Sequence, residues 1–152
     1  MFDTVVIATD GSESAQRAVT VALDLARRFD AVVHALYVVD AGDIQGSPDQ
    51  IRDEMQTALE ETGERALGEI VEQAPGEVVT SVRRGEPVDE ICQYVDEFDA
   101  DMVATGTRGR HGEHSFLLGS VAEGVVRRCP APVLTVRQLE EGEGEHGPDV
   151  VH

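Results

Sequence analysis

Residues 101–120 read DMVATGTRGRHGEHSFLLGS, and this stretch decides the fold class. Its apolar beginning, residues 101–105, has the composition of a short buried strand. A glycine-rich segment follows, and a helical apolar pattern then covers residues 115–128, where Cys129-Pro130 ends it. Because a strand that leads through glycines into a helix is the building unit of parallel α/β sheets, the stretch predicts an α/β fold.

Strand and helix patterns alternate through the rest of the chain. Strands are predicted at residues 4–9, 31–39, 77–84, 101–105 and 132–136, and helices at residues 15–29, 48–74, 87–98 and 115–128. Ser47 is expected to cap the longest helix, with Pro48 at its first position and Gln50 completing a capping box. Strands that alternate with helices in a chain of 152 residues predict one domain with a parallel, doubly wound sheet.

The chain is strongly acidic. Thirty Asp and Glu stand against twelve basic residues, all of them Arg, and the formal net charge is −18. Since nucleic acids and anionic membranes both attract basic surfaces, we expect neither as a partner. Such a composition fits an ordinary acidic cytosolic protein or one adapted to molar salt, where a Debye length of about 3 Å screens repulsion between carboxylates. We favour the halophilic interpretation.

The termini and the cysteines indicate a cytoplasmic protein. Residues 1–12 contain no basic leader, and no apolar run approaches the roughly 18 residues of a membrane span. Cys92 and Cys129 lie in apolar periodic segments and are expected to be buried free thiols. Residues 138–152 carry five acids without Arg and lose all periodicity. We therefore expect a domain over residues 1–137 and a disordered, solvated tail over residues 138–152.

Two familiar phosphate-binding patterns can be rejected. Gly142, Gly144 and Gly147 form a literal G-x-G-x-x-G. They lie in the acidic tail, however, without the preceding strand and following helix that a dinucleotide site requires. The P-loop pattern is excluded because it needs a Lys, which this chain lacks.

The stronger candidate is Gly106-Thr-Arg-Gly109, followed after nine residues by Gly119-Ser120. It begins at the carboxyl end of a predicted strand, where open parallel sheets bind ligands. Glycines there let backbone N–H groups approach phosphate oxygens, and the start of the next helix adds positive potential. We expect Gly119 and Ser120 in the first turns of that helix, where Gly costs about 1 kcal/mol relative to Ala. Ligand approach and tight helix packing both remain open as reasons for Gly119.

Asp10 and Arg108 are the charged candidates at the same sheet edge. Asp10 ends the first predicted strand, and its carboxylate suits ribose hydroxyls or a divalent cation. Capping of the next helix by Asp10 or Ser12 is the alternative. Arg108 and Arg110 supply positive charge to the loop for a phosphate or for solvent alone, and Arg108 is the better candidate because it lies between two glycines.

Metal and catalytic constellations are not apparent. His111 and His114 lie three residues apart in a glycine-containing loop without a third ligand, so we expect no zinc site. No nucleophile, base and orienting group can be assembled from the serines, each of which has a capping or binding explanation. We therefore expect no catalytic residues and at most slow nucleotide hydrolysis.

Three motifs resemble the universal stress protein family, of UspA-like domains. They are VVIATDGSESA (residues 5–15), HALYVVD (residues 34–40) and GTRGRHGEHSFLLGSVAEGVVRRCPAPVLTV (residues 106–136). The resemblance covers about residues 1–137, and its G-x2-G-x9-G-S spacing is typical of the members that bind ATP. It implies a five-stranded parallel sheet in the order 3-2-1-4-5 with two helices on each face.

The resemblance also assigns roles to residues. Asp10 would contact the ribose, the backbone of Val38 would meet adenine, and glycines would surround the phosphates. The nucleotide-binding residues expected from the resemblance and the loop charge are Ala8, Thr9, Asp10, Val38, Gly106, Arg108, Gly109, Gly119, Ser120 and Val121. The family commonly dimerises through its last strand, here between Pro132 and Val136, which would cover an exposed sheet edge.

The expected function is that of an ATP-binding regulatory protein of the stress response. Mg²⁺ would accompany the nucleotide, held by Asp10 or by the phosphates alone. One alternative is a dimeric scaffold whose site is vestigial or takes AMP or a cyclic nucleotide. Another is an ATP hydrolase or nucleotidyl transferase on this fold; DGSES stands after the first strand where such enzymes usually carry an SGG-like loop, which counts against it.

Overall fold

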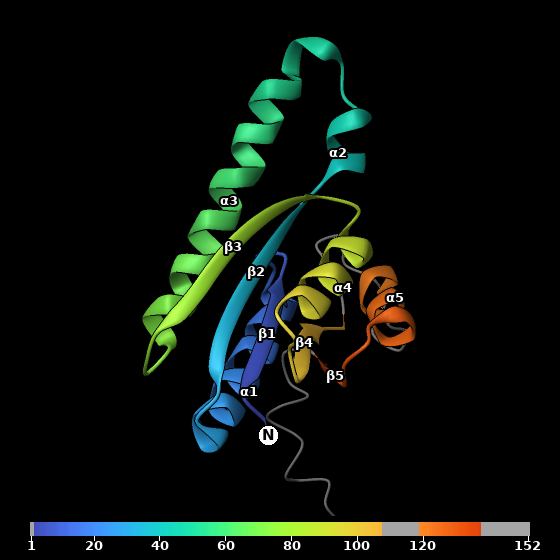
Figure 1. Cartoon of the computed structure of the whole chain (residues 1–152). Helices are drawn as coiled ribbons and strands as arrows, with labels where there is room; N and C mark the ends of the chain where they lie inside the picture. Colours follow the sequence, from blue (N-terminus) through green and yellow to red (C-terminus); the bar gives the residue numbers. More distant parts are fainter. Residues whose placement is uncertain (1, 108–118, 138–152) are drawn as a thin grey trace, which may run out of the picture.

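Five parallel strands form one sheet in the order β3-β2-β1-β4-β5. The computed structural model describes residues 2–107 and 119–137. Within them the strands are β1 (Thr4–Thr9), β2 (Val32–Asp40), β3 (Val78–Gly85), β4 (Met102–Gly106) and β5 (Val133–Val136). The parallel pairing and the strand order confirm the predicted fold, with β1 at the centre of the sheet (Figure 1).

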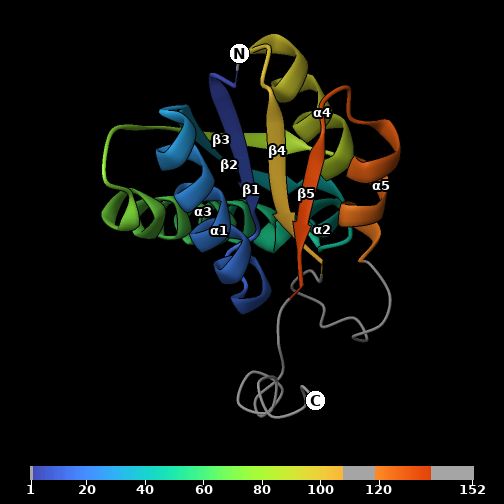
Figure 2. The ribbon, with the colours of Figure 1, turned by 90° about the horizontal axis from the view of Figure 1, so that it is seen from below.

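Helices cover both faces of this sheet (Figure 2). Helices α1 (Glu13–Phe29) and α3 (Arg52–Gln73) pack on one face, and α4 (Pro87–Glu97) and α5 (Ser120–Arg128) pack on the other. The short helix α2 (Ala41–Gln45) and the 3-10 turn η1 (Asp49–Ile51) join β2 to α3. Helix α3 extends past the carboxyl ends of the strands, so α2 and the start of α3 stand beside that edge (Figure 1).

Each face of the sheet has its own apolar core. Val5, Val6 and Ile7 in β1 are all 0% exposed. Their side chains alternate between the faces: Val5 and Ile7 join the cluster beneath α1 and α3, and Val6 joins the cluster beneath α4 and α5. Burial on both faces explains why β1 reads as a continuous apolar run in the sequence.

A polar network lies inside the core beneath α4. The Nδ1 atom of His34 is 2.8 Å from the hydroxyl of Tyr94, and the Ser81 hydroxyl is 3.1 Å from the same oxygen. Burial holds the pKa of His34 below its usual value. The guanidinium of Arg83 lies over the Tyr94 ring, 4.7 Å from its centre, and pairs with Glu97 at 3.0 Å. These contacts join α4 to β2 and β3.

Three features of the helices differ from the sequence prediction. The helix expected from Ser115 begins at Ser120, because Gly119 has an extended backbone with φ −65° and ψ 160°; residues 115–118 lie outside the described residues. The N-cap residue of the long helix α3 is Ile51 rather than Ser47, because η1 intervenes, and the hydroxyl of Ser47 donates to the sulfur of Met55 at 2.6 Å. Helix α2 escapes prediction because five residues are too few to show a helical period.

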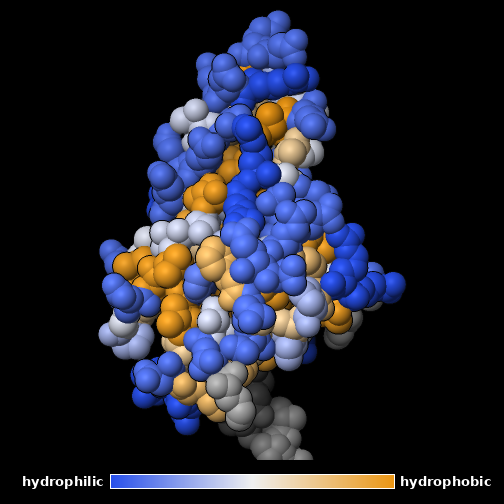
Figure 3. All heavy atoms as spheres, viewed as in Figure 1, coloured by the Kyte–Doolittle hydropathy of each residue, from blue (hydrophilic) through white to orange (hydrophobic). Residues whose placement is uncertain are grey.

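The outer surface is largely hydrophilic in the view of Figure 3. In the part of the chain that the structure describes, no helix is long and apolar enough to cross a membrane. Cys92 and Cys129 are free thiols as predicted, but they are half-buried rather than buried. Each packs against the core beneath α4 and α5 from its border, which leaves part of the side chain exposed. The predicted tail, residues 138–152, lies outside the described residues.

Candidate functional site

The sheet divides at the carboxyl ends of its two central strands. The described pairing of β1 with β4 ends at Ile7 and Ala104. Past this point Ala8 and Thr9 pair with β2, whereas the end of β4 pairs with β5. The two strands thus turn to opposite neighbours, which makes their ends the topological switch point where open α/β sheets bind ligands.

A cleft opens at this switch point, with about 820 Å³ of space including its open mouth. The cleft takes its lining from β1, β2, β4 and the starts of three helices. The lining residues are Ala8, Thr9, Asp10, Ala15, Leu36, Val38, Asp40, Pro87, Ile91, Thr105, Gly106, Thr107, Gly119, Ser120, Val121 and Ala122.

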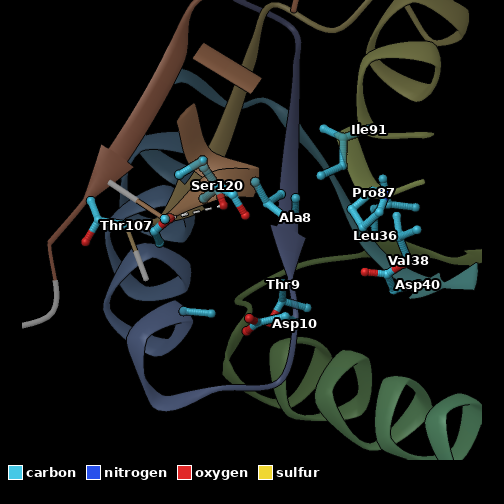
Figure 4. A pocket seen from close by; sticks show the side chains of 16 residues that line it. Ala8, Thr9, Asp10, Leu36, Val38, Asp40, Pro87, Ile91, Thr107 and Ser120 are labelled. Atoms are coloured by element: carbon cyan, nitrogen blue, oxygen red, sulfur yellow. Dashed lines mark hydrogen bonds between the residues drawn. The ribbon is translucent and has the colours of Figure 1, made fainter. Parts of the chain in front are cut away.

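Two chemically different sides flank the end of β1 in this cleft (Figure 4). The apolar side comes from β2 and α4 and consists of Leu36, Val38, Pro87 and Ile91. The polar side comes from the segment after β4 and the start of α5, where Thr107 and Ser120 lie. Thr9 and Asp10 lie between the two sides, at the end of β1 (Figure 4). A ligand that fills the cleft would meet apolar surface at one end and backbone and hydroxyl groups at the other.

Strand β2 is longer than its central neighbour, and the difference exposes backbone to the cleft. The pairing of β1 with β2 ends at Thr9 and Tyr37, but β2 continues beside β3 as far as Asp40. Val38 therefore lies past the end of β1, where its backbone borders the cleft. A ligand in the space beside Val38 could hydrogen-bond to the backbone N–H and C=O groups of β2 that no longer face β1.

A tight turn between β1 and α1 holds Asp10 at the cleft. The Oδ1 atom of Asp10 accepts from the amide of Ser12 at 2.9 Å, and Thr9 Oγ1 accepts from the amide of Gly11 at 3.1 Å. Gly11 has φ 80°, the left-handed region that favours Gly. Ser12 takes the N-cap position of α1 but makes no side-chain cap hydrogen bond. The turn thus uses one oxygen of Asp10 to fix the carboxylate beside the cleft.

Helix α5 begins at the polar side without a side-chain cap. Its N-cap residue is Gly119, whose amide donates to the carbonyl of Thr107 at 2.6 Å and whose carbonyl accepts from the amide of Glu123 at 2.9 Å. In the described structure no side chain caps the helix, while Ser120, Val121 and Ala122 of its first turn line the cleft. Their amides and the positive end of the helix dipole are directed to this part of the site.

Most of the predicted site residues meet in this one cleft. They are Ala8, Thr9, Asp10, Val38, Gly106, Gly119, Ser120 and Val121. Arg108 and Gly109 lie outside the described residues, as do Arg110, His111 and His114. Gly119 lies at the helix N-cap rather than inside the helix. The free-energy cost of Gly within a helix therefore does not apply to this residue.

Sequence reasoning missed Asp40, Pro87 and Ile91, which also line the cleft. Asp40 is the last residue of β2 and Asp10 directly follows β1, so the strand-end rule that selects Asp10 would also have selected Asp40. Pro87 and Ile91 carried no such signal. They belong to the inner face of a helix, and only the packing of α4 against β2 turns that face toward the cleft.

The described lining contains two carboxylates, Asp10 and Asp40, and no basic side chain. One Asp40 oxygen, Oδ1, already accepts from the amide of Gly42 at 2.9 Å and caps α2. Among residues 2–107 and 119–137, no group of three or more His, Cys, Asp or Glu could hold a metal ion.

Strand order, divided sheet and cleft together define a doubly wound α/β protein with a ligand cleft at its switch point. The universal stress protein family model matches residues 1–137. A universal stress protein of Methanocaldococcus jannaschii is 35% identical over 142 residues, covering 91% of this chain and 84% of the relative. A Thermus aquaticus universal stress protein is 37% identical over 147 residues, covering 90% and 100%. The chain belongs to the universal stress protein family.

Solved structures share this fold. Hypothetical protein MJ0577 superposes with a TM-score of 0.81 at 24% identity, covering 92% of this chain and 99% of that one, and shows the fold alone. A universal stress protein in complex with cAMP has a TM-score of 0.66 at 27% identity, with coverage of 90% and 97%. The universal stress protein from Archaeoglobus fulgidus in complex with dAMP has a TM-score of 0.63 at 25% identity, with coverage of 90% and 100%.

Proposed function

We propose that this chain is a cytoplasmic regulatory protein of the stress response that binds ATP in the cleft between β1 and β4. The observation that carries the proposal is the start of α5, where a helix without a side-chain cap presents its first turn to the cleft. Such helix starts bind anions because their amides point outward and the dipole favours negative charge. The regulatory part rests on membership of the universal stress protein family.

The phosphates would lie on the polar side of the cleft. Gly106 and Gly119 bring backbone close to the ligand, and the amides of Ser120 and Val121 donate to phosphate oxygens. Arg108 and Gly109, in the segment between the two glycines, complete the expected set. Mg²⁺ would be held mainly by the phosphates, because the described residues contain no group of three or more metal-ligating side chains. Asp10, directly after β1, would be the carboxylate beside it.

The base and ribose would fill the rest of the cleft. Leu36, Pro87 and Ile91 offer an apolar slot for a flat purine, and the backbone of Val38 past the end of β1 can hydrogen-bond to its edge. Ala8 and Thr9 border the ribose, and Asp10 would accept from its hydroxyl groups. Two solved relatives support an adenine nucleotide, since cAMP and dAMP share adenine, a sugar and a phosphate with ATP.

The decisive experiment is mass spectrometry of small molecules released on denaturing the purified protein, followed by equilibrium binding of ATP, ADP, AMP and cAMP with and without Mg²⁺. We expect near-stoichiometric ATP or ADP. Gly119→Val should weaken ATP binding at least tenfold, about 1.4 kcal/mol. The matched control is Gly68→Val in α3, where an added Cβ meets nothing within 4 Å.

Recovery of no nucleotide, together with failure to bind added ATP, would refute the proposal and leave the glycines a packing role. A preference for AMP or cAMP over ATP would contradict ATP as the ligand. It would favour the alternative of a dimeric scaffold with a mononucleotide site. Because no general base is evident, ATP turnover should stay slow. Rapid turnover would point to an enzyme instead.

The proposed assembly is a homodimer through β5. This strand lies at an edge of the sheet, paired only with β4 in the described structure, and Val133, Leu134 and Thr135 are half-buried. Pairing with β5 of a second copy would give the backbone N–H and C=O groups of this edge hydrogen-bond partners, and it would cover these side chains. Light scattering of the purified chain should give the mass of a dimer, and a monomer at micromolar concentration would contradict this assembly.

A further inference from the structure

Cys92 and Cys129 lie at one seam between neighbouring helices. Helices α4 and α5 approach closely: a Cβ on Gly124 would lie 2.6 Å from Val88 Cγ2. Where α5 ends, Arg128 forms an ion pair with Asp89. Cys129 directly follows Arg128, and Cys92 lies three residues after Asp89, about one helical turn further along α4. The ion pair therefore brings the two cysteines to neighbouring positions.

Both cysteines pack against the same apolar cluster beneath α4 and α5. The nearness of Cys92 also helps to raise the pKa of Cys129, as expected for two neighbouring thiols. Both are free and half-buried, so a small reagent can reach them. The backbone of Cys129 is held in place because its amide donates to the carbonyl of Val125 at 2.9 Å.

We infer that Cys92 and Cys129 form a redox site, which a peroxide converts into an intramolecular disulfide. The Cys92 thiolate attacks the peroxide, an S–O bond forms as the O–O bond breaks, and Cys92 becomes a sulfenic acid. The sulfur of Cys129 then attacks that of Cys92, forming the S–S bond and breaking the S–O bond. In total, two thiols and one hydrogen peroxide give one disulfide and two waters, and the peroxide accepts the two electrons.

The surroundings of the two sulfurs decide which one reacts first. Burial, and then contact with Cys92, raise the pKa of Cys129 to about 12, so this thiol stays protonated at neutral pH. Cys92 is left as the attacking sulfur. Once Cys92 is a sulfenic acid, its sulfur is electrophilic, and the sulfur of Cys129 can attack it.

The disulfide would join two walls of the cleft. Ile91, adjacent to Cys92, lines the cleft from α4, and the first turn of α5 lines it from the other helix. The cross-link would also close residues 92–129 into a loop that contains the whole segment from Gly106 to Gly119. Formation of the disulfide would thus fix these helices to each other whatever ligand the cleft binds.

The test uses the full chain, reduced and then treated with a small excess of hydrogen peroxide. Remaining thiols are alkylated, and the protein is digested with trypsin without reduction. The Arg positions place Cys92 in the peptide of residues 85–108 and Cys129 in the peptide of residues 129–137. We expect these two peptides linked within a single chain. Two alkylated thiols, sulfinic acids on both cysteines, or linkage only between chains would overturn the inference.

Single serine variants test the order of attack. In Cys129→Ser, dimedone should trap a sulfenic acid at Cys92, whereas in Cys92→Ser the remaining thiol should react at least tenfold more slowly at pH 7. Equal trapping in both variants would overturn the assignment of Cys92 as the attacking sulfur.

Thermal unfolding gives a second readout. The disulfide should raise the midpoint by about 5–10 °C, and a dithiol reductant should reverse the shift. Neither serine variant should show this reversible rise after peroxide. A wild-type chain that forms the cross-link but loses stability would show that the helices must separate to form it, which contradicts a preformed pair.

Discussion

Helices α4 and α5 both begin at the cleft, on the same face of the sheet, yet their N-termini are satisfied differently. The carboxylate of Glu86 caps α4 and accepts from the amides of Val88 and Asp89 at 3.0 and 3.2 Å. Helix α5 begins at Gly119, and no side chain of the described structure takes the corresponding position. One helix start carries an anion of its own chain, and among the described residues no side chain takes that place at the other.

The difference shows why a helix start alone does not define an anion site. Both helices have outward amides and a positive dipole end, but Glu86 already occupies that position on α4. Gly119 has no side chain that could supply such a group. Under the proposed function an anionic ligand would therefore bind at α5, while Pro87 and Ile91 at the start of α4 contribute apolar surface to the same cleft.

The largest expected effect comes from giving α5 the kind of cap that α4 has. In Gly119→Asp, the new carboxylate should accept from the first-turn amides and repel phosphate, which weakens ATP binding on the order of 100-fold. Gly119→Ala adds bulk without a cap and should lose less than about tenfold. Calorimetric titration of ATP into both variants measures the difference. Equal losses would show that bulk, and not the cap, decides binding.

The reverse change removes the cap of α4. Glu86→Ala leaves the amides of Val88 and Asp89 without their acceptor and should cost about 1 kcal/mol of unfolding free energy, with ATP affinity changed less than about twofold. Glu86→Gln keeps an acceptor oxygen and serves as the control. Denaturant unfolding and ATP titration give the two readouts. A large loss of ATP affinity in Glu86→Ala would contradict the separate roles of the two helix starts.

A pH titration sharpens the comparison because it acts on the packing of α4. His34 is buried beside Tyr94, and burial holds its pKa below the usual value. The unfolded chain then binds this proton more readily, so stability should fall as pH drops below about 6.5 and be unaffected by His34 above it. Denaturant unfolding of wild type and His34→Phe at pH 7.5 and 5.5 tests this. An equal change of unfolding free energy with pH in both proteins would show that His34 does not cause the pH dependence.

The smallest expected effect is that of salt on binding at α5. The net charge of −18 repels ATP at long range, and raising salt from 0.1 to 1 M shortens the Debye length from about 10 to about 3 Å. ATP affinity should therefore rise about two- to fivefold, while uncharged adenosine is unaffected. A fall in ATP affinity would show that local attraction, including that of Arg108, outweighs the charge of the whole chain.

The sequence predicted the fold more completely than it predicted the cleft. Residues 4–9 coincide with β1, because a strand buried on both faces must be apolar throughout. Asp10 and Gly106 could be placed at one sheet edge, since the carboxyl ends of parallel strands meet there, whereas Val38 was expected only from the family resemblance. The N-cap of the long helix was mispredicted, because the 3-10 turn η1 follows Pro48 and moves the start of α3 to Arg52.

By itself, the sequence determined the order of strands and helices, the acidic surface and the strand-end residues, because each depends on residues close together in the chain. The tertiary structure decided three further features. It set the start of α5 at Ser120, through the contact of Gly119 with Thr107, and it turned Pro87 and Ile91 toward β2. It also packed Cys92 and Cys129 against the same apolar cluster. Each of these depends on which face of one element packs against another, and that choice is made only when the whole sheet and its helices assemble.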